Sequence, residues 1–320
     1  MVRQHGPGGH AGGLMRRASM QLGRGWLGKP LVIAVPYVWL AVFFLAPFVI
    51  MFYISWVDMG NDILPFKPLW NAQTGVLQLR YDNYTALWRS SQGVWFHTLY
   101  LDAYWRSAWY ATLSALICLG LGYPFAYAMT RTPARWRGLL LLMVMLPFWT
   151  SLLLRVYAWK GILADQGVLN QALLALGLVQ TPPVMLYTDV SLLVGMAYVY
   201  LPFMVLPLYA SLSKQNPQWL EAAYDLGSTP WRAFWTITVP LSWRGVVAGL
   251  ILVFVPSLGE FVIPSLLGGP ENLMIGRVLW DEMFAANNWP RASALATVMV
   301  VAIVLPLVWY ARVVAEDSRA

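Results

Sequence analysis

Apolar residues along this 320-residue chain gather into six blocks separated by polar stretches. A helix that crosses the hydrocarbon core of a bilayer, which is roughly 30 Å thick, needs about 20 predominantly apolar residues. All six blocks meet or approach that length, so the pattern predicts six membrane-spanning helices. They are Leu31–Trp56, Trp105–Met129, Gly138–Trp159, Val190–Leu212, Gly245–Leu267 and Ala292–Val314.

Proline interrupts three of these blocks. A proline inside a membrane helix removes one backbone hydrogen bond and tends to kink the helix. Helices that move or line a path often contain such kinks, although a static bend is the simpler interpretation. The prolines are Pro36 and Pro47 in the first block, Pro202 and Pro207 in the fourth, and Pro256 and Pro264 in the fifth.

The composition supports a membrane protein. Hydrophobic residues make up 59% of the chain and charged residues only 11%, with a mean hydropathy of +0.58. Soluble domains carry roughly a quarter charged residues, so a disordered chain and an ordinary cytosolic enzyme are excluded. The single cysteine, Cys118, cannot form an intrachain disulfide. The net charge of +7 is divided among loops between apolar blocks, and we expect no nucleic-acid partner.

The basic residues also predict the orientation, because cytoplasmic loops of membrane proteins are enriched in lysine and arginine. Both termini are expected in the cytoplasm. The first block is too long for the core of a signal peptide and lacks a cleavage site, so it should remain as a helix. This orientation places 13 of the 21 basic residues inside: Arg3, Arg16, Arg17, Arg24, Lys29, Arg131, Arg135, Arg137, Lys214, Arg232, Arg244, Arg312 and Arg319.

The chain is therefore expected to contain five parts. The external loop is rich in tryptophan and tyrosine and should lie on the membrane surface or meet an external partner. The core contains a long cytoplasmic loop at 213–244. The parts are a basic cytoplasmic tail (1–29), a first membrane helix (30–56), the external loop (57–104), a five-helix core (105–314) and a cytoplasmic tail (315–320).

The sequence patterns expected for nucleotide binding and for catalysis are incomplete or absent. Residues 23–30 read GRGWLGKP, which is close to a P-loop, but Pro30 replaces the required hydroxyl and a membrane helix follows directly. The histidines His5, His10 and His97 are scattered, and neither HExxH nor GxSxG occurs. We expect no catalytic residue, no metal site and no cofactor bound by this chain. An intramembrane enzyme is a remote alternative.

The cytoplasmic loop contains a short amphipathic helix. Pro217 suits its start, Gln218–Leu226 alternates apolar and acidic positions, and Gly227 can end it in a left-handed conformation. Pro230 suits the first turn of a second helix. An element of this kind can dock in a groove on a soluble partner. The simpler alternative is a helix that lies on the membrane surface.

This loop resembles the EAA motif of ABC-importer permeases. It begins with Glu-Ala-Ala, has a glycine four residues after the second alanine, and continues to an apolar–x–Pro element ending at Pro240. The resemblance implies an all-α type I permease with six membrane helices. It also implies that the loop couples the chain to an ATPase subunit through Glu221, Ala222, Ala223, Asp225 and Gly227.

Further segments resemble the first permease subunit of polyamine (spermidine/putrescine) importers, namely LPFWTSLLLRVYAW at 146–159, LPFMVLPL at 201–208 and VFVPSLGEFVIPSLLGG at 253–269. The resemblance implies a multi-pass protein of the bacterial inner membrane that works by alternating access. Its implied partners are a second homologous permease, an ATPase dimer that holds ATP and Mg²⁺, a periplasmic substrate-binding protein and the lipid bilayer. Related permeases for ferric iron, thiamine, phosphonate or sulfate share the EAA loop and remain the alternative.

A polyamine site should offer carboxylates for ammonium groups and aromatic faces for cation–π contacts. Glu260 falls inside the fifth block, where a buried carboxylate needs a partner. That partner is either a substrate amine or Arg155, which would form a purely structural ion pair. Asp281 and Glu282 lie in an outer loop, as solvated surface or as the external mouth. Aromatic candidates for the pathway, each also explicable by packing, are Trp149, Tyr157, Tyr198 and Tyr200.

Overall fold

The protein is represented by a computed structural model that describes residues 28–60, 65–70, 79–89 and 98–317. Most of the predicted basic tail, including Arg3, Arg16, Arg17 and Arg24, lies outside these ranges, as do Arg319 and the three histidines. In the described part, all regular structure is helical apart from isolated bridge residues, such as the pair Met59 and Phe66. Five helices are long and apolar enough to cross a membrane, and one bent pair makes a sixth candidate. The predicted all-α membrane fold is confirmed.

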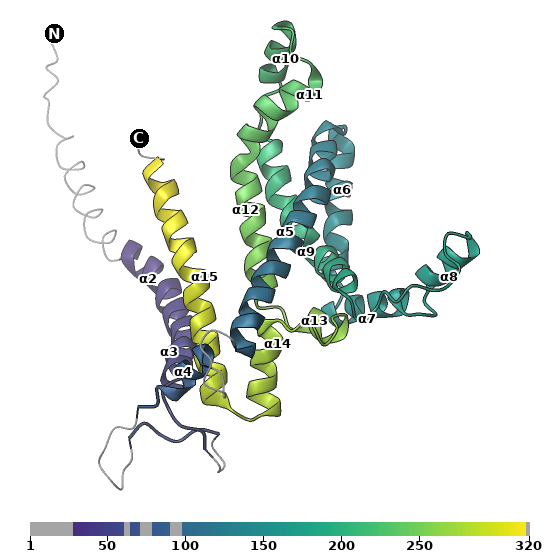
Figure 1. The fold of residues 1–320 in the computed structure, drawn as a ribbon. Helices are drawn as coiled ribbons and strands as arrows, with labels where there is room; N and C mark the ends of the chain where they lie inside the picture. The colour runs from purple at the N-terminus through teal and green to yellow at the C-terminus, as the bar shows by residue number, and fades with distance from the viewer. Residues whose placement is uncertain (1–27, 61–64, 71–78, 90–97, 318–320) are drawn as a thin grey trace, which may run out of the picture.

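Three long helices pack together at the centre of the molecule: α5 (Leu99–Arg131), α9 (Asp189–Leu212) and α12 (Val239–Leu258) (Figure 1). Glycines let α12 approach α9 closely. A Cβ atom at Gly245 would lie 2.4 Å from the Cβ of Ser211, and one at Gly249 would lie 2.6 Å from the sulfur of Met204. This GxxxG pair therefore acts as a contact surface between two membrane helices.

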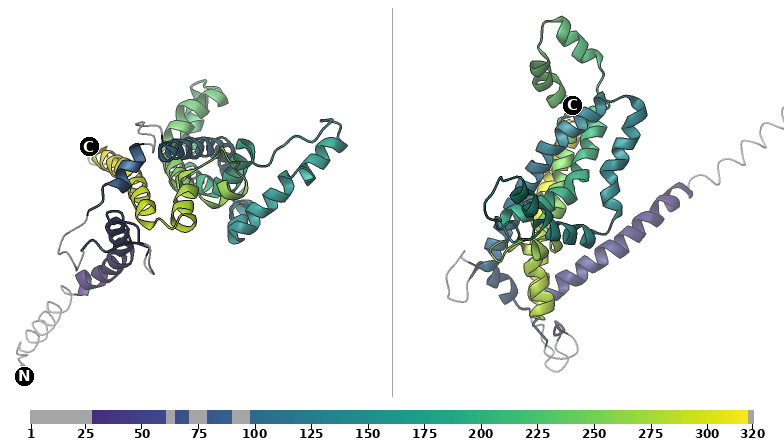
Figure 2. Two further views of the ribbon diagram at one scale, coloured as in Figure 1. Left: turned by 60° about the horizontal axis from the view of Figure 1, so that its bottom comes forward. Right: turned by 90° about the vertical axis from the view of Figure 1, so that its right-hand side faces the viewer.

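The first span stands apart from this centre. It consists of α2 (Gly28–Leu40), a π-helical turn η1 (Ala41–Leu45) and α3 (Ala46–Ile54). It packs against the last helix, α15 (Trp289–Asp317), and runs obliquely to the core helices (Figure 2). None of its most apolar window is buried within this chain. A helix that is apolar all round and uncovered needs lipid or another subunit around it.

The third span is broken, so the predicted continuous helix Gly138–Trp159 is wrong. A helical arm turns through 90° at the break, and its second half points sideways from the core (Figure 1). The parts are α6 (Ala134–Met145), a 3₁₀ turn η2 (Leu146–Trp149), α7 (Leu152–Leu163) and α8 (Val168–Ala175).

The cause of this break is local. Pro147 lacks an N–H group and starts the 3₁₀ turn, and Thr150 and Ser151 then take extended backbone conformations with ψ of 154° and 134°. Residues after Ser151 no longer follow the axis of α6. Arg155 in α7 therefore cannot be placed at a membrane depth by counting residues from Gly138.

The fifth span differs at both ends from the predicted Gly245–Leu267. Its helix is unbroken from Pro230 to Leu258, because α11 (Pro230–Ala233) continues through a π-helical turn η3 (Phe234–Thr238) into α12. Half of the predicted cytoplasmic loop is thus the beginning of this span. The chain leaves the helix after Leu258 and then forms α13 (Val262–Leu266), so Glu260 lies in a break rather than inside a helix.

The end of the molecule opposite α10 (Gln218–Asp225) is built from short elements around α15. These elements are α4 (Asp82–Trp88), α14 (Ile275–Trp280) and a π-helical turn η4 (Asp281–Ala285). Asp281 and Glu282 were expected in a loop, but they belong to η4.

Candidate functional site

The helix α10 forms as its local sequence predicts. Its end is closed by two backbone bonds, from Ser228 N–H to the Ala223 carbonyl and from Gly227 N–H to the Tyr224 carbonyl, both 2.9 Å. Gly227 has a φ of +82°, which only glycine adopts at little cost. This is a Schellman termination. The predicted left-handed helix end at Gly227 is confirmed.

Together, α10 and α11 project beyond the bundle (Figures 1 and 2). Of the five predicted coupling residues, only Ala223 is buried, while Glu221, Ala222, Asp225 and Gly227 are exposed. Leu226 is 89% exposed at the end of the helix.

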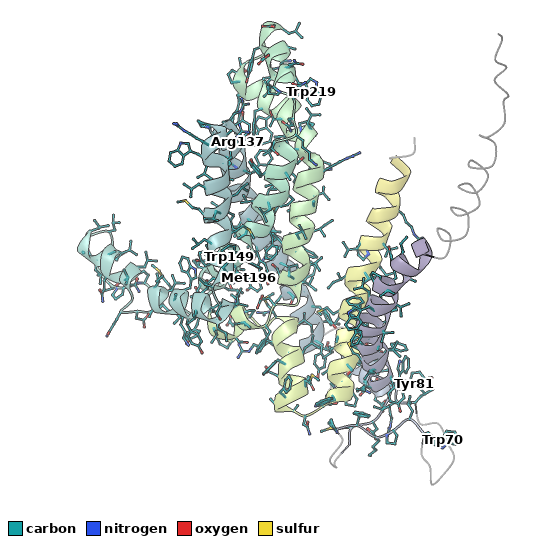
Figure 3. The ribbon with its side chains drawn as sticks, turned by 180° about the vertical axis from the view of Figure 1, so that it is seen from behind. Trp70, Tyr81, Arg137, Trp149, Met196 and Trp219 are labelled. Carbon is teal, nitrogen blue, oxygen red and sulfur yellow. The ribbon has the colours of Figure 1, made fainter. Side chains whose placement is uncertain are left out.

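Exposed Trp219, labelled in Figure 3, and exposed Tyr224 add apolar surface to α10. Leu226 is almost uncovered, and Trp219 and Tyr224 are each exposed over almost half of their surface, so the tip of the molecule presents an apolar and acidic surface outward. Neither Trp219 nor Leu226 was among the coupling residues predicted from the sequence, although large apolar residues in a solvated loop were a usable signal.

At the other end of α12, the carboxylate of Glu260 forms hydrogen bonds across the break between α12 and α13. Its Oε1 atom accepts hydrogen bonds from the backbone N–H groups of Phe261 (3.1 Å), Val262 (2.9 Å) and Ile263 (3.4 Å). Its Oε2 atom accepts a bond from the hydroxyl of Tyr200 in α9. The carboxylate thus caps α13 and links it to α9, and the Glu260 side chain is only partly buried.

Arg155 forms no ion pair with Glu260 in this structure. Its Nε and Nη1 atoms are buried without a hydrogen-bond partner, and its guanidinium lies 6.0 Å from the centre of the Phe148 ring. Arg155 and Tyr198 line one groove of about 380 Å³, together with Trp159. Trp159 meets the Tyr198 ring edge to face at 5.6 Å, a contact that sequence reasoning missed.

The four predicted aromatic residues have different surroundings in this structure. Tyr200 is only 5% exposed, so its hydroxyl positions Glu260 while its ring faces the core. Trp149 in η2 (Figure 3) and Tyr157 in α7 are 79% and 55% exposed. No ring contact joins any two of the four.

The two acids at the expected external mouth have different surroundings. The hydroxyl of Tyr100 donates a 2.5 Å hydrogen bond to Glu282, whereas Asp281 is exposed and lies 4.0 Å from Arg277. Three aromatic side chains in contact, here called the aromatic column, extend from η4 to the break between α12 and α13 that contains Glu260. Trp280 stacks on Phe261 at 4.4 Å and contacts Phe284 at 4.2 Å. Sequence reasoning missed this column, because its members lie on separate short elements.

Relatives with known roles match most of the chain. The permease protein of the Haemophilus influenzae spermidine/putrescine transport system is 34% identical over 285 residues, covering 89% of this chain and 93% of the relative. Its Escherichia coli counterpart is 38% identical over 231 residues, covering 72% of this chain and 81% of the relative.

A crystal structure of a bacterial ABC transporter that imports alginate contains a chain with the same fold. Its TM-score is 0.65 at 17% identity, covering 94% of this chain and 99% of the other. Residues 29–319 match the family model described as the binding-protein-dependent transport system inner membrane component. The chain therefore belongs to that family and is a multi-pass inner-membrane permease subunit of an ABC importer.

Proposed function

We propose that this chain is half of the translocation pathway of an ATP-driven polyamine importer. The observation that carries the proposal is the 34–38% identity to spermidine/putrescine permease proteins over most of the chain. The geometry at Glu260 fits a cationic cargo, because a partly accessible carboxylate lies in a helix break beside partly buried Phe261. An ammonium group can bind such a carboxylate through a charge-assisted hydrogen bond.

The partners in this proposal are a second homologous permease, an ATPase dimer and a periplasmic binding protein. A related structure, that of the alginate ABC transporter in complex with its periplasmic protein, supports the last of these. The surface of α10 supports ATPase docking, because its apolar and acidic side chains face outward. ATP and Mg²⁺ would be held by the ATPase subunits.

In the membrane orientation that the basic residues predict, the α10 end of the molecule faces the cytoplasm. The C-terminal end of α15 points to the same side (Figure 1), and Arg137 lies toward the same end as Trp219 (Figure 3). The distribution of basic residues favours the same sidedness.

A transport assay with the assembled complex tests the cargo. We expect uptake of labelled spermidine into proteoliposomes that contain the binding protein and internal ATP. Unlabelled putrescine should compete, whereas thiamine, a phosphonate, sulfate and ferric iron should not. Uptake of one of the latter solutes in labelled form, together with no uptake of spermidine, would overturn the polyamine assignment in favour of that solute.

A further inference from the structure

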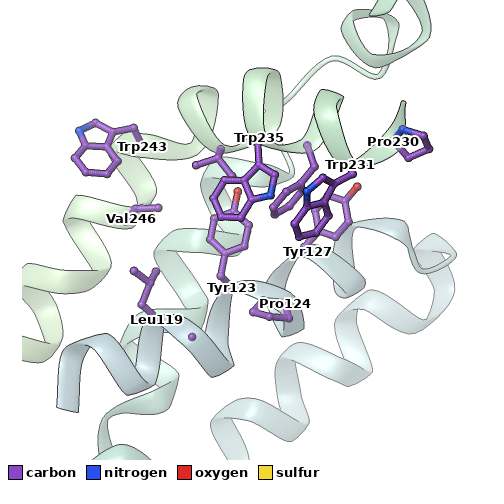
Figure 4. Close-up of a pocket in the computed structure, with 12 residues that line it drawn as sticks. Leu119, Tyr123, Pro124, Tyr127, Pro230, Trp231, Trp235, Trp243 and Val246 are labelled. Carbon is purple, nitrogen blue, oxygen red and sulfur yellow. The ribbon is translucent and has the colours of Figure 1, made fainter. Parts of the chain in front are cut away.

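An apolar groove of about 710 Å³ lies between α5 and the first half of the fifth span. Its walls are mainly aromatic. Tyr123 and Tyr127 of α5 face Trp231, Phe234 and Trp235, which follow Pro230 (Figure 4). The groove is large enough for an acyl chain and lies at the α10 end of two membrane helices. Tryptophan and tyrosine gather at this level of membrane proteins, where hydrocarbon meets the headgroups.

A second, polar pocket of about 200 Å³ shares one wall with the groove. Tyr127 lines both, and Arg131 and Arg137 line the second. Arg131 donates a 2.8 Å hydrogen bond to the hydroxyl of Tyr127, and its guanidinium lies 5.0 Å from the centre of that ring. Within the described ranges, neither arginine forms an ion pair with a carboxylate. The Nε and Nη2 atoms of Arg137 donate 2.8 Å hydrogen bonds to the carbonyls of Thr132 and Thr130, which hold its guanidinium at the end of α5. Two positive charges that no carboxylate of the described residues neutralises therefore lie beside an apolar groove.

The groove is kept open by the backbone. Gly120 has no side chain, and a Cβ atom added there would meet nothing within 4 Å. Pro124, one turn later, provides no N–H group for the carbonyl of Gly120 and lines the groove as well. On the opposite wall, Phe234–Thr238 form a π-helical turn, an irregularity that is frequent at functional sites.

We propose that the groove and the polar pocket together bind one anionic phospholipid of the inner leaflet. An acyl chain occupies the aromatic groove, and the phosphate group lies between Arg131 and Arg137. Arginine suits this role because its planar guanidinium matches the geometry of a phosphate. The charge of the pocket selects an anionic headgroup over a zwitterionic one. The inner-leaflet assignment rests on the proposed orientation, whereas the binding site does not.

A lipid bound at this position would also affect how ATP hydrolysis on the ATPase is coupled to import. Pro217 and Leu220, at the start of α10, line the polar pocket, and Pro230 and Trp231 of α11 line the groove. A bound lipid therefore contacts the end of α5 and both helices of the projecting tip. It would hold the tip at a fixed angle to the membrane, and delipidation would lower the number of cargo molecules imported per ATP.

Native mass spectrometry of the assembled transporter tests the site directly. The complex is released from detergent supplemented with phosphatidylglycerol, phosphatidylcholine or inorganic phosphate alone. We expect phosphatidylglycerol to be retained at each copy of this chain. Gly120→Leu adds a side chain whose Cβ meets nothing within 4 Å and which extends into the groove, and it should lower retention at least fivefold. Gly138→Leu is the matched control, because its Cβ also meets nothing within 4 Å and it lies outside the groove.

A second pair of variants, one test and one control, examines the polar pocket that would hold the headgroup. Arg131→Gln should weaken phosphatidylglycerol retention about fivefold, the effect of about 1 kcal/mol for one basic residue at an anionic lipid surface. Retention of phosphatidylcholine should not change. Arg135→Gln is the control, because Arg135 is also exposed but lines neither pocket.

Equal lipid retention in the Gly120→Leu and Gly138→Leu complexes would overturn the proposal, and so would binding of inorganic phosphate alone. Cross-linking from a maleimide–benzophenone probe at Gly120→Cys to the second permease, with no lipid retained, would assign the groove to a subunit contact instead. The native Cys118 is fully buried and should not take up the probe. These readouts do not depend on the cargo, so a failed polyamine assay leaves them interpretable.

Discussion

The two ends of the fifth span are chemically opposite. At the α10 end, large apolar side chains such as Leu226 and Trp219 are exposed. At the far end, the carboxylate of Glu260 is satisfied by one hydroxyl and three backbone N–H groups. The first end therefore has apolar surface that a partner protein could cover. At the second end the carboxylate already has its hydrogen bonds within the chain. Under the proposed function, a cargo amine would bind to the accessible side of a carboxylate that also holds α13 in place.

The largest effect is expected at the α10 end. Glu221→Lys reverses an exposed charge on α10, and we expect loss of ATPase binding in a pull-down and loss of uptake. Asp165→Lys is the control, because Asp165 is also exposed but lies in the connection between α7 and α8. Normal ATPase binding by the Glu221→Lys protein would remove α10 from the coupling interface.

At the satisfied end, Glu260→Gln should lower spermidine uptake at least tenfold. Glutamine keeps the size of the side chain and an oxygen that can accept bonds from α13, but it lacks the charge that an ammonium group requires. Assembly with the ATPase should be unchanged. Wild-type uptake by this variant would show that Glu260 is only the cap of α13.

Tyr200→Phe tests whether the hydroxyl of Tyr200 positions the carboxylate of Glu260. The change removes one donor to Glu260, and a hydrogen bond to a charged group contributes about 1.5 kcal/mol or more. We expect spermidine uptake to require about a tenfold higher concentration for half-maximal rate, with the maximal rate much less affected. Tyr209→Phe, on the same helix, is the control, because none of the described hydrogen bonds involves its hydroxyl. Equal curves for the two variants would show that Tyr200 does not position the carboxylate.

The smallest effect is expected at Gly227. Alanine at a φ of +82° costs about 1 kcal/mol, so amide hydrogens of α10 should exchange about fivefold faster in the Gly227→Ala protein. Gly177→Ala, at a φ of +69° in the loop after α8, is the control that should leave α10 unchanged. Unaltered exchange in α10 would mean that partner contacts, not the glycine, set its end.

Features determined by neighbouring residues could be predicted from the sequence. Pro217, Gly227 and Pro230 each act within one helical turn, and α10 begins and ends where they indicate. The break at Thr150 and Ser151 was missed, because apolar residues continue on both sides of it and make one block long enough to span a membrane. Pro147 was a usable local signal there.

The environment of Glu260 was equally hidden in the sequence. Its partner Tyr200 is 60 residues away in another span. The aromatic column forms only where the helical stretch that contains Trp280 and Phe284 meets Phe261. The carboxylate could be selected as unusual from its position in an apolar block. Whether it binds an arginine, a hydroxyl or its own backbone depends on tertiary contacts that no spacing encodes.

The glycine contacts between α9 and α12 limit how the subunit can change shape. Ser211 and Met204 already occupy the space beside Gly245 and Gly249, so these two helices cannot slide past each other without a steric clash. They should travel as a single rigid body during a transport cycle. Rotation must then be accommodated at the irregular joints on either side, the turn at Gly227 and the segment from Gly259 to Phe261, which places a hinge beside each of the two candidate binding surfaces.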